Sequence, residues 1–227
     1  MRLGVYHRLL NFRWIPLGWC CVVGFGIFIH AGMAQHVSAQ SDAESIVLED
    51  FADADENNFP KNWDAQRSKA TAQETYAIGQ NDGETFLSAK NASQRVYTKS
   101  ISWDPRTHPI LTWRWRIHSV PEDAEFIAAV YPSLDTDLMF IPVNTKYVWS
   151  LDKPVGSIKE GGMFGSTEIV IRTGGEPKGE WVEERINVYE DFKKIHDHEP
   201  APKAWGISLL GGPGVEVDFG SLRVHAE

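Results

Sequence analysis

Cysteine is almost absent from this chain of 227 residues, whose only two, Cys20 and Cys21, lie near its N-terminus. A domain formed by the residues after them contains no disulfide, no cysteine nucleophile and no cysteine-ligated metal. Its stability therefore has to come from a hydrophobic core, and nine Trp and eleven Phe provide ample material for one.

Basic side chains are also scarce, with 22 Lys and Arg against 31 Asp and Glu and a net charge of −9. An acidic surface repels the phosphates of nucleic acids and anionic lipids, so the composition excludes nucleic acid as a partner and disfavours membranes. Recognisable catalytic motifs are missing too: there is no Gly-x-Ser-x-Gly elbow, no His-Glu-x-x-His and no Walker-type glycine loop. These absences favour a binding or structural role.

The N-terminal segment differs from the rest of the chain. Three arginines are the only charges before Asp42, and an apolar run over 14–29 leads to small residues that end at Ala39. This pattern predicts a helical secretory signal peptide over 1–39, with cleavage after Ala39 or, alternatively, after Ala34. An uncleaved anchor is the other interpretation, although the run is shorter than the roughly 20 residues that span a bilayer.

Removal of this leader would leave 188 residues, with 19 basic and 31 acidic side chains and a net charge of −12. That length fits a single domain over 40–227. We expect this domain to be periplasmic or secreted, in a Gram-negative bacterium, and to have no membrane partner after cleavage. We also expect it to need no cofactor.

Short apolar runs separated by Gly, Pro, Asn and Asp follow one another through this domain, and only one short helix, over 190–196, is indicated. This spacing is typical of an all-β antiparallel sandwich and not of a βαβ fold. The expected strands are 45–51, 75–79, 85–90, 95–102, 110–118, 126–131, 138–143, 146–151, 167–173, 180–189, 204–210 and 215–224.

Two of these strands indicate where a ligand would bind. Side chains alternate between the faces of a strand, so Trp113 and Trp115 share one face, and Arg114 and Arg116 share the other. Each buried Trp removes about 200 Å² from water, so the Trp face must be core. The arginines then point to the outside of the sheet.

The second strand alternates in the same way. Val182 and Ile186 share one face, onto which Glu184 intrudes, while Arg185 and Asn187 share the other. A solvated outer face is the simplest interpretation. The functional interpretation is that a saccharide site is formed on one concave surface, because guanidinium and amide groups match pairs of hydroxyl or carboxylate oxygens. Its predicted lining is Arg114, Arg116, Arg185 and Asn187, with Tyr147 stacking on a sugar ring.

Several separate motifs resemble those of one bacterial family of exported proteins, the domain of unknown function numbered 3047. They are Trp113-Arg114-Trp115-Arg116-Ile117, Tyr147-Val148-Trp149, Glu184-Arg185-Ile186-Asn187-Val188 followed by Asp191-Phe192, and the opening Phe51, Phe59-Pro60 and Trp63. The resemblance implies a jelly-roll sandwich of the galactose-binding-like type with no assigned activity. By analogy of fold alone, it suggests carbohydrate binding.

Two further sets of residues are considered as metal ligands. Glu49 and Asp50, with Glu216 and Asp218, lie on the first and last expected strands and are candidates for a structural Ca²⁺ site, with solvated edge charges as the alternative. The sequence contains no pattern for any other metal site. His196 and His198 are two apart, and a loop is their simplest interpretation.

The sequence thus predicts a non-enzymatic module that binds carbohydrate or envelope glycan. One alternative is a hydrolase or lyase acting on polysaccharide, for which Asp135 and Asp137 would lie about 7 Å apart if extended. A structural component of an envelope complex is the other alternative. The oligomeric state is not indicated by the sequence.

Overall fold

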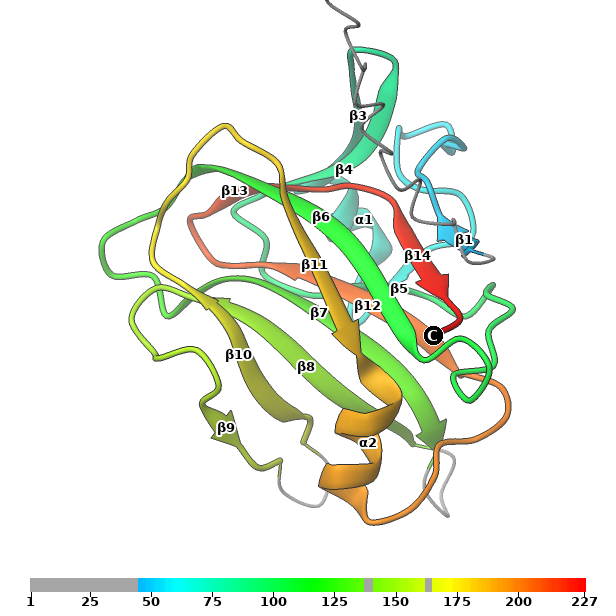
Figure 1. The fold of residues 1–227 in the computed structure, drawn as a ribbon. Helices are drawn as coiled ribbons and strands as arrows, with labels where there is room; N and C mark the ends of the chain where they lie inside the picture. Colours follow the sequence, from blue (N-terminus) through cyan, green and yellow to red (C-terminus); the bar gives the residue numbers. More distant parts are fainter. Residues whose placement is uncertain (1–44, 137–140, 162–164) are drawn as a thin grey trace, which may run out of the picture. The chain divides into compact units, whose positions relative to one another are not determined.

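The computed structural model describes residues 45–136, 141–161 and 165–227, all of which belong to one compact unit. The predicted leader and its cleavage site lie outside the described residues. Two seven-stranded sheets pack face to face and confirm the predicted all-β antiparallel sandwich (Figure 1). No helix among the described residues is long and apolar enough to cross a bilayer.

The first sheet is organised around one long strand, β6, which pairs with three others. Its order is β1 (Ser45–Glu49), β14 (Leu222–His225), β6 (Ile110–Ser119), β13 (Glu216–Phe219), β4 (Glu84–Lys90) and β3 (Tyr76–Asn81). β13 and β14 pair with successive parts of one edge of β6, and β11 (Val182–Asn187) pairs with the opposite edge. Residues 215–224, expected as one strand, are divided between β13 and β14. Both strands run antiparallel to β6, and between them the Gly220 N–H donates to the Arg114 carbonyl at 2.8 Å.

The second sheet contains one parallel pair in an otherwise antiparallel arrangement. Its order is β2 (Asp64–Ala65), β5 (Val96–Thr98), β12 (Gly206–Gly211), β7 (Phe126–Thr136), β8 (Pro142–Ser150), β10 (Thr167–Thr173) and β9 (Ile158–Lys159). β8 and β10 run parallel because the chain crosses back before it enters β10, and β9 pairs with β10 on the way.

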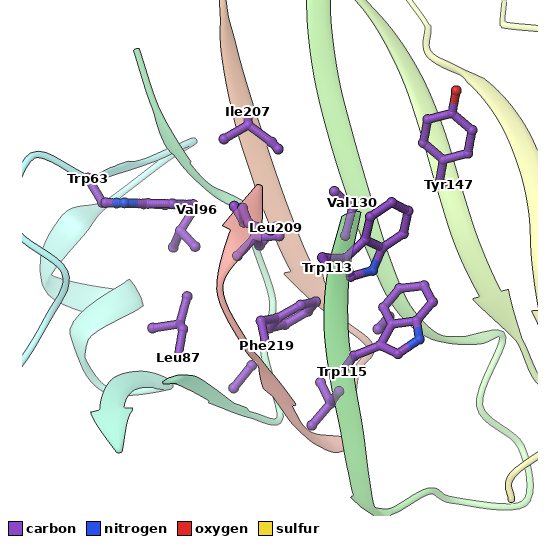
Figure 2. Close-up of a cluster of buried hydrophobic side chains, with 14 of the residues drawn as sticks. Trp63, Leu87, Val96, Trp113, Trp115, Val130, Tyr147, Ile207, Leu209 and Phe219 are labelled. Carbon is purple, nitrogen blue, oxygen red and sulfur yellow. The ribbon is translucent and has the colours of Figure 1, made fainter. Parts of the chain in front are cut away.

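Aromatic rings from both sheets meet in the core (Figure 2). Trp113 and Trp115 of β6 are edge-to-face at 5.4 Å between centroids. Trp115 also lies 5.4 Å from Trp149 of β8, and Trp113 lies 6.2 Å from Tyr147 of the same strand. The predicted core face of β6 is confirmed, because these indoles are almost completely buried. Burial of rings this large is the main stabilising contribution in a domain without disulfides.

Two helices complete the fold. The predicted short helix is α2 (Val188–His196), which begins two residues earlier than expected and places Phe192 in the core. Asn187 caps it, since its side-chain oxygen accepts a hydrogen bond of 3.0 Å from the Glu190 N–H. The other helix, α1 (Lys69–Gln73), was not predicted, because so short a helix shows no helical period in the sequence.

Candidate functional site

The outer side of the first sheet brings most of the predicted binding residues together, and we call it the arginine face. It is formed by Thr112, Arg114, Arg116, Trp181, Glu183, Arg185, Asp218 and Arg223. In the ladder between β6 and β11, Arg185 lies opposite Thr112 and Glu183 lies opposite Arg114. Arg114, Arg116 and Arg185 therefore share one surface, as the alternation predicted.

Acidic neighbours already pair with two of these arginines. Arg116 donates to Asp218 at 2.7 and 3.1 Å, and His118 contacts the same carboxylate oxygen at 2.7 Å. Asp218 is only 2% exposed, so this pair is part of the folded structure. Arg114 donates to Glu84 at 2.9 Å. The guanidinium donors that were expected to meet a ligand are thus largely used within the protein.

An indole also covers these arginines. The ring centroid of Trp181 lies 5.0 Å from the guanidinium carbon of Arg114 and 4.4 Å from that of Arg116. Phe86 packs edge-on against Trp181 at 5.8 Å. A hollow of about 230 Å³ remains beside this stack, with charged side chains of both signs in its lining. Around Arg114 and Arg116, the arginine face is therefore packed and internally paired.

Of the other two predicted residues, Asn187 lies at the end of this surface and Tyr147 does not belong to it. Tyr147 is 0% exposed and points into the core from β8, so it cannot stack on a sugar there, and that prediction is wrong. Its hydroxyl donates to Asp191 of α2 at 3.0 Å. Burial raises the pKa of the Tyr147 hydroxyl well above its ordinary value and also raises that of the Asp191 carboxyl. Asn187 caps α2, and its amide donates to Glu227 at 3.1 Å.

The four carboxylates proposed for Ca²⁺ do not converge in the structure. Glu49, on β1, accepts hydrogen bonds from two backbone N–H groups and from the Trp63 indole at 2.7 Å. Glu216 pairs with Lys90 at 2.5 Å, and Asp218 is engaged on the arginine face. No group of three potential metal-ligating side chains occurs within the described ranges.

Of the two residues considered for catalysis, Asp135 is described by the structure. Asp135 lies one residue before the end of β7, and its carboxylate accepts a hydrogen bond from the next backbone N–H at 2.7 Å and lies 3.9 Å from His198. Asp137 lies outside the described residues. His196 and His198 both pack against the Phe192 ring, which gives them a structural role.

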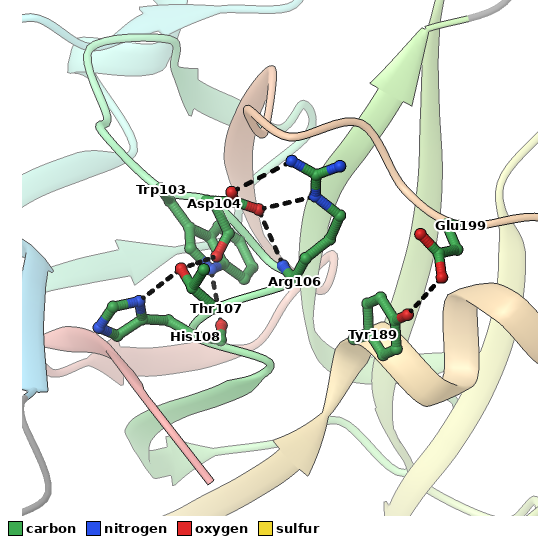
Figure 3. A network of polar contacts seen from close by, with 7 residues as sticks. All are labelled: Trp103, Asp104, Arg106, Thr107, His108, Tyr189 and Glu199. Carbon is green, nitrogen blue, oxygen red and sulfur yellow. Dashed lines mark hydrogen bonds and ion pairs between the residues drawn. The ribbon is translucent and has the colours of Figure 1, made fainter.

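A second polar cluster stabilises the loop before β6 (Figure 3). Asp104 accepts hydrogen bonds from the Arg106 backbone and guanidinium, while the Trp103 indole donates to the His108 carbonyl at 2.8 Å. Burial opposes ionisation of Asp104, but the Arg106 hydrogen bonds outweigh it and lower the pKa of that carboxyl. These contacts close the loop on itself.

The outer side of the second sheet has a different character, and we call it the aromatic face. One row of outward residues crosses it: Asp64, Tyr97, Ser208, Tyr131, Lys146, Glu168 and Lys159. Neighbouring strands are about 4.8 Å apart, so the row from β2 to β10 covers roughly 24 Å. This surface is long enough for several units of a polymer.

The first hollow on this face encloses about 220 Å³. Its lining includes Gln66, Arg95, Tyr97, Asn144, Trp205 and Ser208. Both aromatic rings are half-buried, and the exposed ammonium of Lys99 lies 3.9 Å above the Trp205 centroid. Asn144 is held in place, because its amide donates to the Pro142 carbonyl at 3.0 Å and its oxygen accepts from Ser133. We call this site the tyrosine–tryptophan hollow.

The second hollow adjoins Tyr131 and encloses about 350 Å³. Lys146 donates to Glu168 at 2.9 Å, and Lys153 reaches the other oxygen of the same carboxylate at 2.9 Å. Burial opposes ionisation of Glu168, but the two lysines outweigh it and lower the pKa of its carboxyl. The lining of this lysine hollow contains two lysines, Lys146 and Lys159, and two glutamates, Glu160 and Glu168, and is therefore close to neutral in charge.

The aromatic face was not predicted from the sequence, because its residues come from segments that are far apart in the chain. Tyr97 lies on β5, Trp205 precedes β12 and Tyr131 lies on β7, and only the sheet order brings them together. The burial of Tyr147 could have been predicted from the alternation within β8. Tyr147 and Trp149 share one face of that strand, in the same way as the two tryptophans of β6, and both are buried.

The family model described as "Protein of unknown function (DUF3047)" matches residues 61–128 and 141–211. The chain belongs to the DUF3047 family. This confirms the resemblance found in the sequence. No curated protein matches this DUF3047 member.

Several solved structures are similar to this DUF3047 chain. The K3 adhesin domain of Lys-gingipain from Porphyromonas gingivalis is 14% identical, with a TM-score of 0.41. The match covers 81% of this chain and 100% of the adhesin domain. The family 11 carbohydrate-binding module of a cellulase from Clostridium thermocellum is 9% identical, with a TM-score of 0.44. This match covers 82% of this chain and 97% of the module. The CBM22-1 xylan-binding domain from Paenibacillus barcinonensis is 8% identical, with a TM-score of 0.37 and coverages of 82% and 97%.

Proposed function

We propose that this protein is an exported, non-catalytic module that binds carbohydrate on its aromatic face. The observation that carries the proposal is the tyrosine–tryptophan hollow, where the rings of Tyr97 and Trp205 line the same space as the amides of Gln66 and Asn144. Aromatic rings offer flat apolar surfaces to a sugar ring, and planar amides offer paired donors and acceptors to its hydroxyls.

The row of outward side chains favours a polymer over a single sugar. Ser208 of the tyrosine–tryptophan hollow lies directly opposite Tyr131, which lines the lysine hollow. A chain bound across both hollows would lie along this row and cross the strands. Longer oligosaccharides should therefore bind more tightly than short ones until both hollows are occupied.

Binding is tested by calorimetry and affinity electrophoresis with a panel of neutral and acidic polysaccharides. We expect Tyr97→Ala and Trp205→Ala each to weaken binding by about tenfold or more, as is usual for aromatic residues at the centre of an interface. Trp181→Ala is the matched control, because this half-buried indole lies on the arginine face. Equal loss in the control variant, or no binding to any member of the panel, would refute the proposal.

Two further measurements address the rest of the proposal. Incubation with each bound polysaccharide should release no new reducing ends or unsaturated products, whereas turnover would favour the hydrolase or lyase alternative. Cell fractionation and N-terminal sequencing of the mature protein should place it outside the cytoplasm with Gln40 as its first residue. Co-purification with an envelope complex in the absence of saccharide binding would favour the structural alternative.

A further inference from the structure

The charges on the aromatic face are unevenly distributed. Among the residues that the structure describes, Arg95 is the only charged one lining the tyrosine–tryptophan hollow. Within the described part of the chain, no carboxylate lies within 4.0 Å of its guanidinium, whereas Arg114, Arg116 and Arg172 all have such a partner. The other described arginines without one, Arg67, Arg185 and Arg223, are exposed, whereas Arg95 is half-buried. A cation without a counterion in a hollow is unusual for a protein with a net charge of −9.

Arg95 is also held in position. Its guanidinium carbon lies 5.5 Å from the ring centroid of Tyr131, which is 7% exposed and fixed in β7. The backbone of Arg95 is fixed as well, because its carbonyl accepts a hydrogen bond of 3.0 Å from the Gln66 N–H. This arrangement orients the planar guanidinium but leaves its donors available to a ligand.

A second cation lies near the first. Lys99 is exposed, contacts the rings of Trp205 and Tyr97, and has no carboxylate within ion-pair distance among the residues described. The neighbouring lysine hollow differs, since Glu160 and Glu168 in its lining balance Lys146 and Lys159. Positive charge on this face is therefore concentrated at the tyrosine–tryptophan hollow.

We propose that the saccharide bound on the aromatic face is acidic, a uronic-acid polymer with one carboxylate paired with the Arg95 guanidinium. This inference rests on the proposed carbohydrate-binding function. A guanidinium and a carboxylate form two parallel hydrogen bonds, and the hollow supplies no internal competitor for them. Lys99 adds a longer-range attraction to the same end of the polymer.

The test compares two ligands that differ only in charge: hexamers of galacturonate or of mannuronate, and the same hexamers after reduction of each carboxyl group to a hydroxymethyl group. Calorimetry at low salt should show that the wild-type protein binds at least one acidic hexamer about tenfold or more tightly than its reduced form. Arg95→Gln should bring the two affinities close to each other. Arg95→Lys keeps the charge but loses the fork geometry and should retain part of the difference.

The control variant is Arg185→Gln, which removes an exposed guanidinium from the arginine face. It should leave the preference for the acidic hexamer unchanged. If the reduced hexamers bind as tightly as the acidic ones, carbohydrate binding stands and the inference of an acidic ligand is wrong. If the preference survives Arg95→Gln or is lost in Arg185→Gln, Arg95 is not the carboxylate site. If neither form of any hexamer binds, the inference and the proposed function both fail.

Discussion

Trp115 and Glu184 form a hydrogen bond of 3.0 Å in the core between the sheets, with the indole nitrogen as donor. The same carboxylate oxygen accepts a hydrogen bond of 2.6 Å from the Arg172 guanidinium of the second sheet. Glu184 is 8% exposed, and its position on the inner face of β11 breaks the apolar pattern of that face. The acid is tolerated there because both sheets supply it with donors.

Removal of this carboxylate should destabilise the fold. Glu184→Ala leaves the Trp115 N–H and the Arg172 guanidinium without their acceptor, and we expect a loss of about 2–4 kcal/mol in the free energy of unfolding. Urea denaturation at pH 7 measures this. Glu183→Gln, at the exposed neighbouring position, should change stability by less than about 0.5 kcal/mol. A change of equal size in both variants would contradict a special role for Glu184.

Gly206 is expected to be intolerant of any side chain. A Cβ atom there would lie 2.5 Å from the Thr98 carbonyl oxygen of β5, which is backbone and cannot rotate away. Gly206→Ala should therefore separate β12 from β5 and cost about 1–3 kcal/mol. Gly175→Ala is the control, because its Cβ would meet only the Leu151 side chain at 3.7 Å. Thermal unfolding of the two variants distinguishes a steric effect from a general preference for glycine.

The ion pairs of Glu168 make stability depend on pH in a defined direction. Its pKa is lowered in the folded state, so its stabilising effect is present above the ordinary Glu pKa of about 4.3 and is lost as the pH falls through the folded value. Glu168→Gln should therefore cost about 1 kcal/mol at pH 7, and the difference from wild type should vanish in acid. Glu160→Gln, an exposed neighbour, should show no such pH dependence.

Tyr147 and Asp191 show the opposite sign. Burial raises the pKa of the Asp191 carboxyl, so ionisation of this group opposes folding at pH values above its ordinary pKa. Asp191→Asn keeps an acceptor for the tyrosine and should maintain or increase stability at pH 7. Tyr147→Phe removes the donor and should cost about 1–3 kcal/mol. Denaturation curves at pH 7 for the two variants should move in different directions, with Tyr189→Phe as the control for an exposed hydroxyl.

Much of the fold follows from residue alternation. The two faces of β6 were predicted correctly, because a strand with Trp113 and Trp115 on one side must bury that side. Asp82 and Gly83 form the loop between β3 and β4, and both residues adopt the positive φ angles that a two-residue hairpin loop requires. Local patterns of this kind are visible without knowledge of the sheet order.

The site could be predicted only in part, for a physical reason. Alternation shows that Arg114 and Arg116 leave the core, but it does not show which acids lie opposite them. Asp218 is distant in sequence and reaches Arg116 only through the pairing of β13 with β6. The tyrosine–tryptophan hollow depends in the same way on strands that meet only in the folded sheet.

The pairing of β1 with β14 has a consequence for how this protein folds. Ser45 lies opposite His225, so one edge of the first sheet joins nearly the most distant residues of the described chain. To bring residues so distant in sequence together, the chain must lose a large amount of conformational entropy before the stabilising contacts between the strands can form. The first sheet therefore cannot be completed until the final strand has been synthesised, and folding should be slow and late.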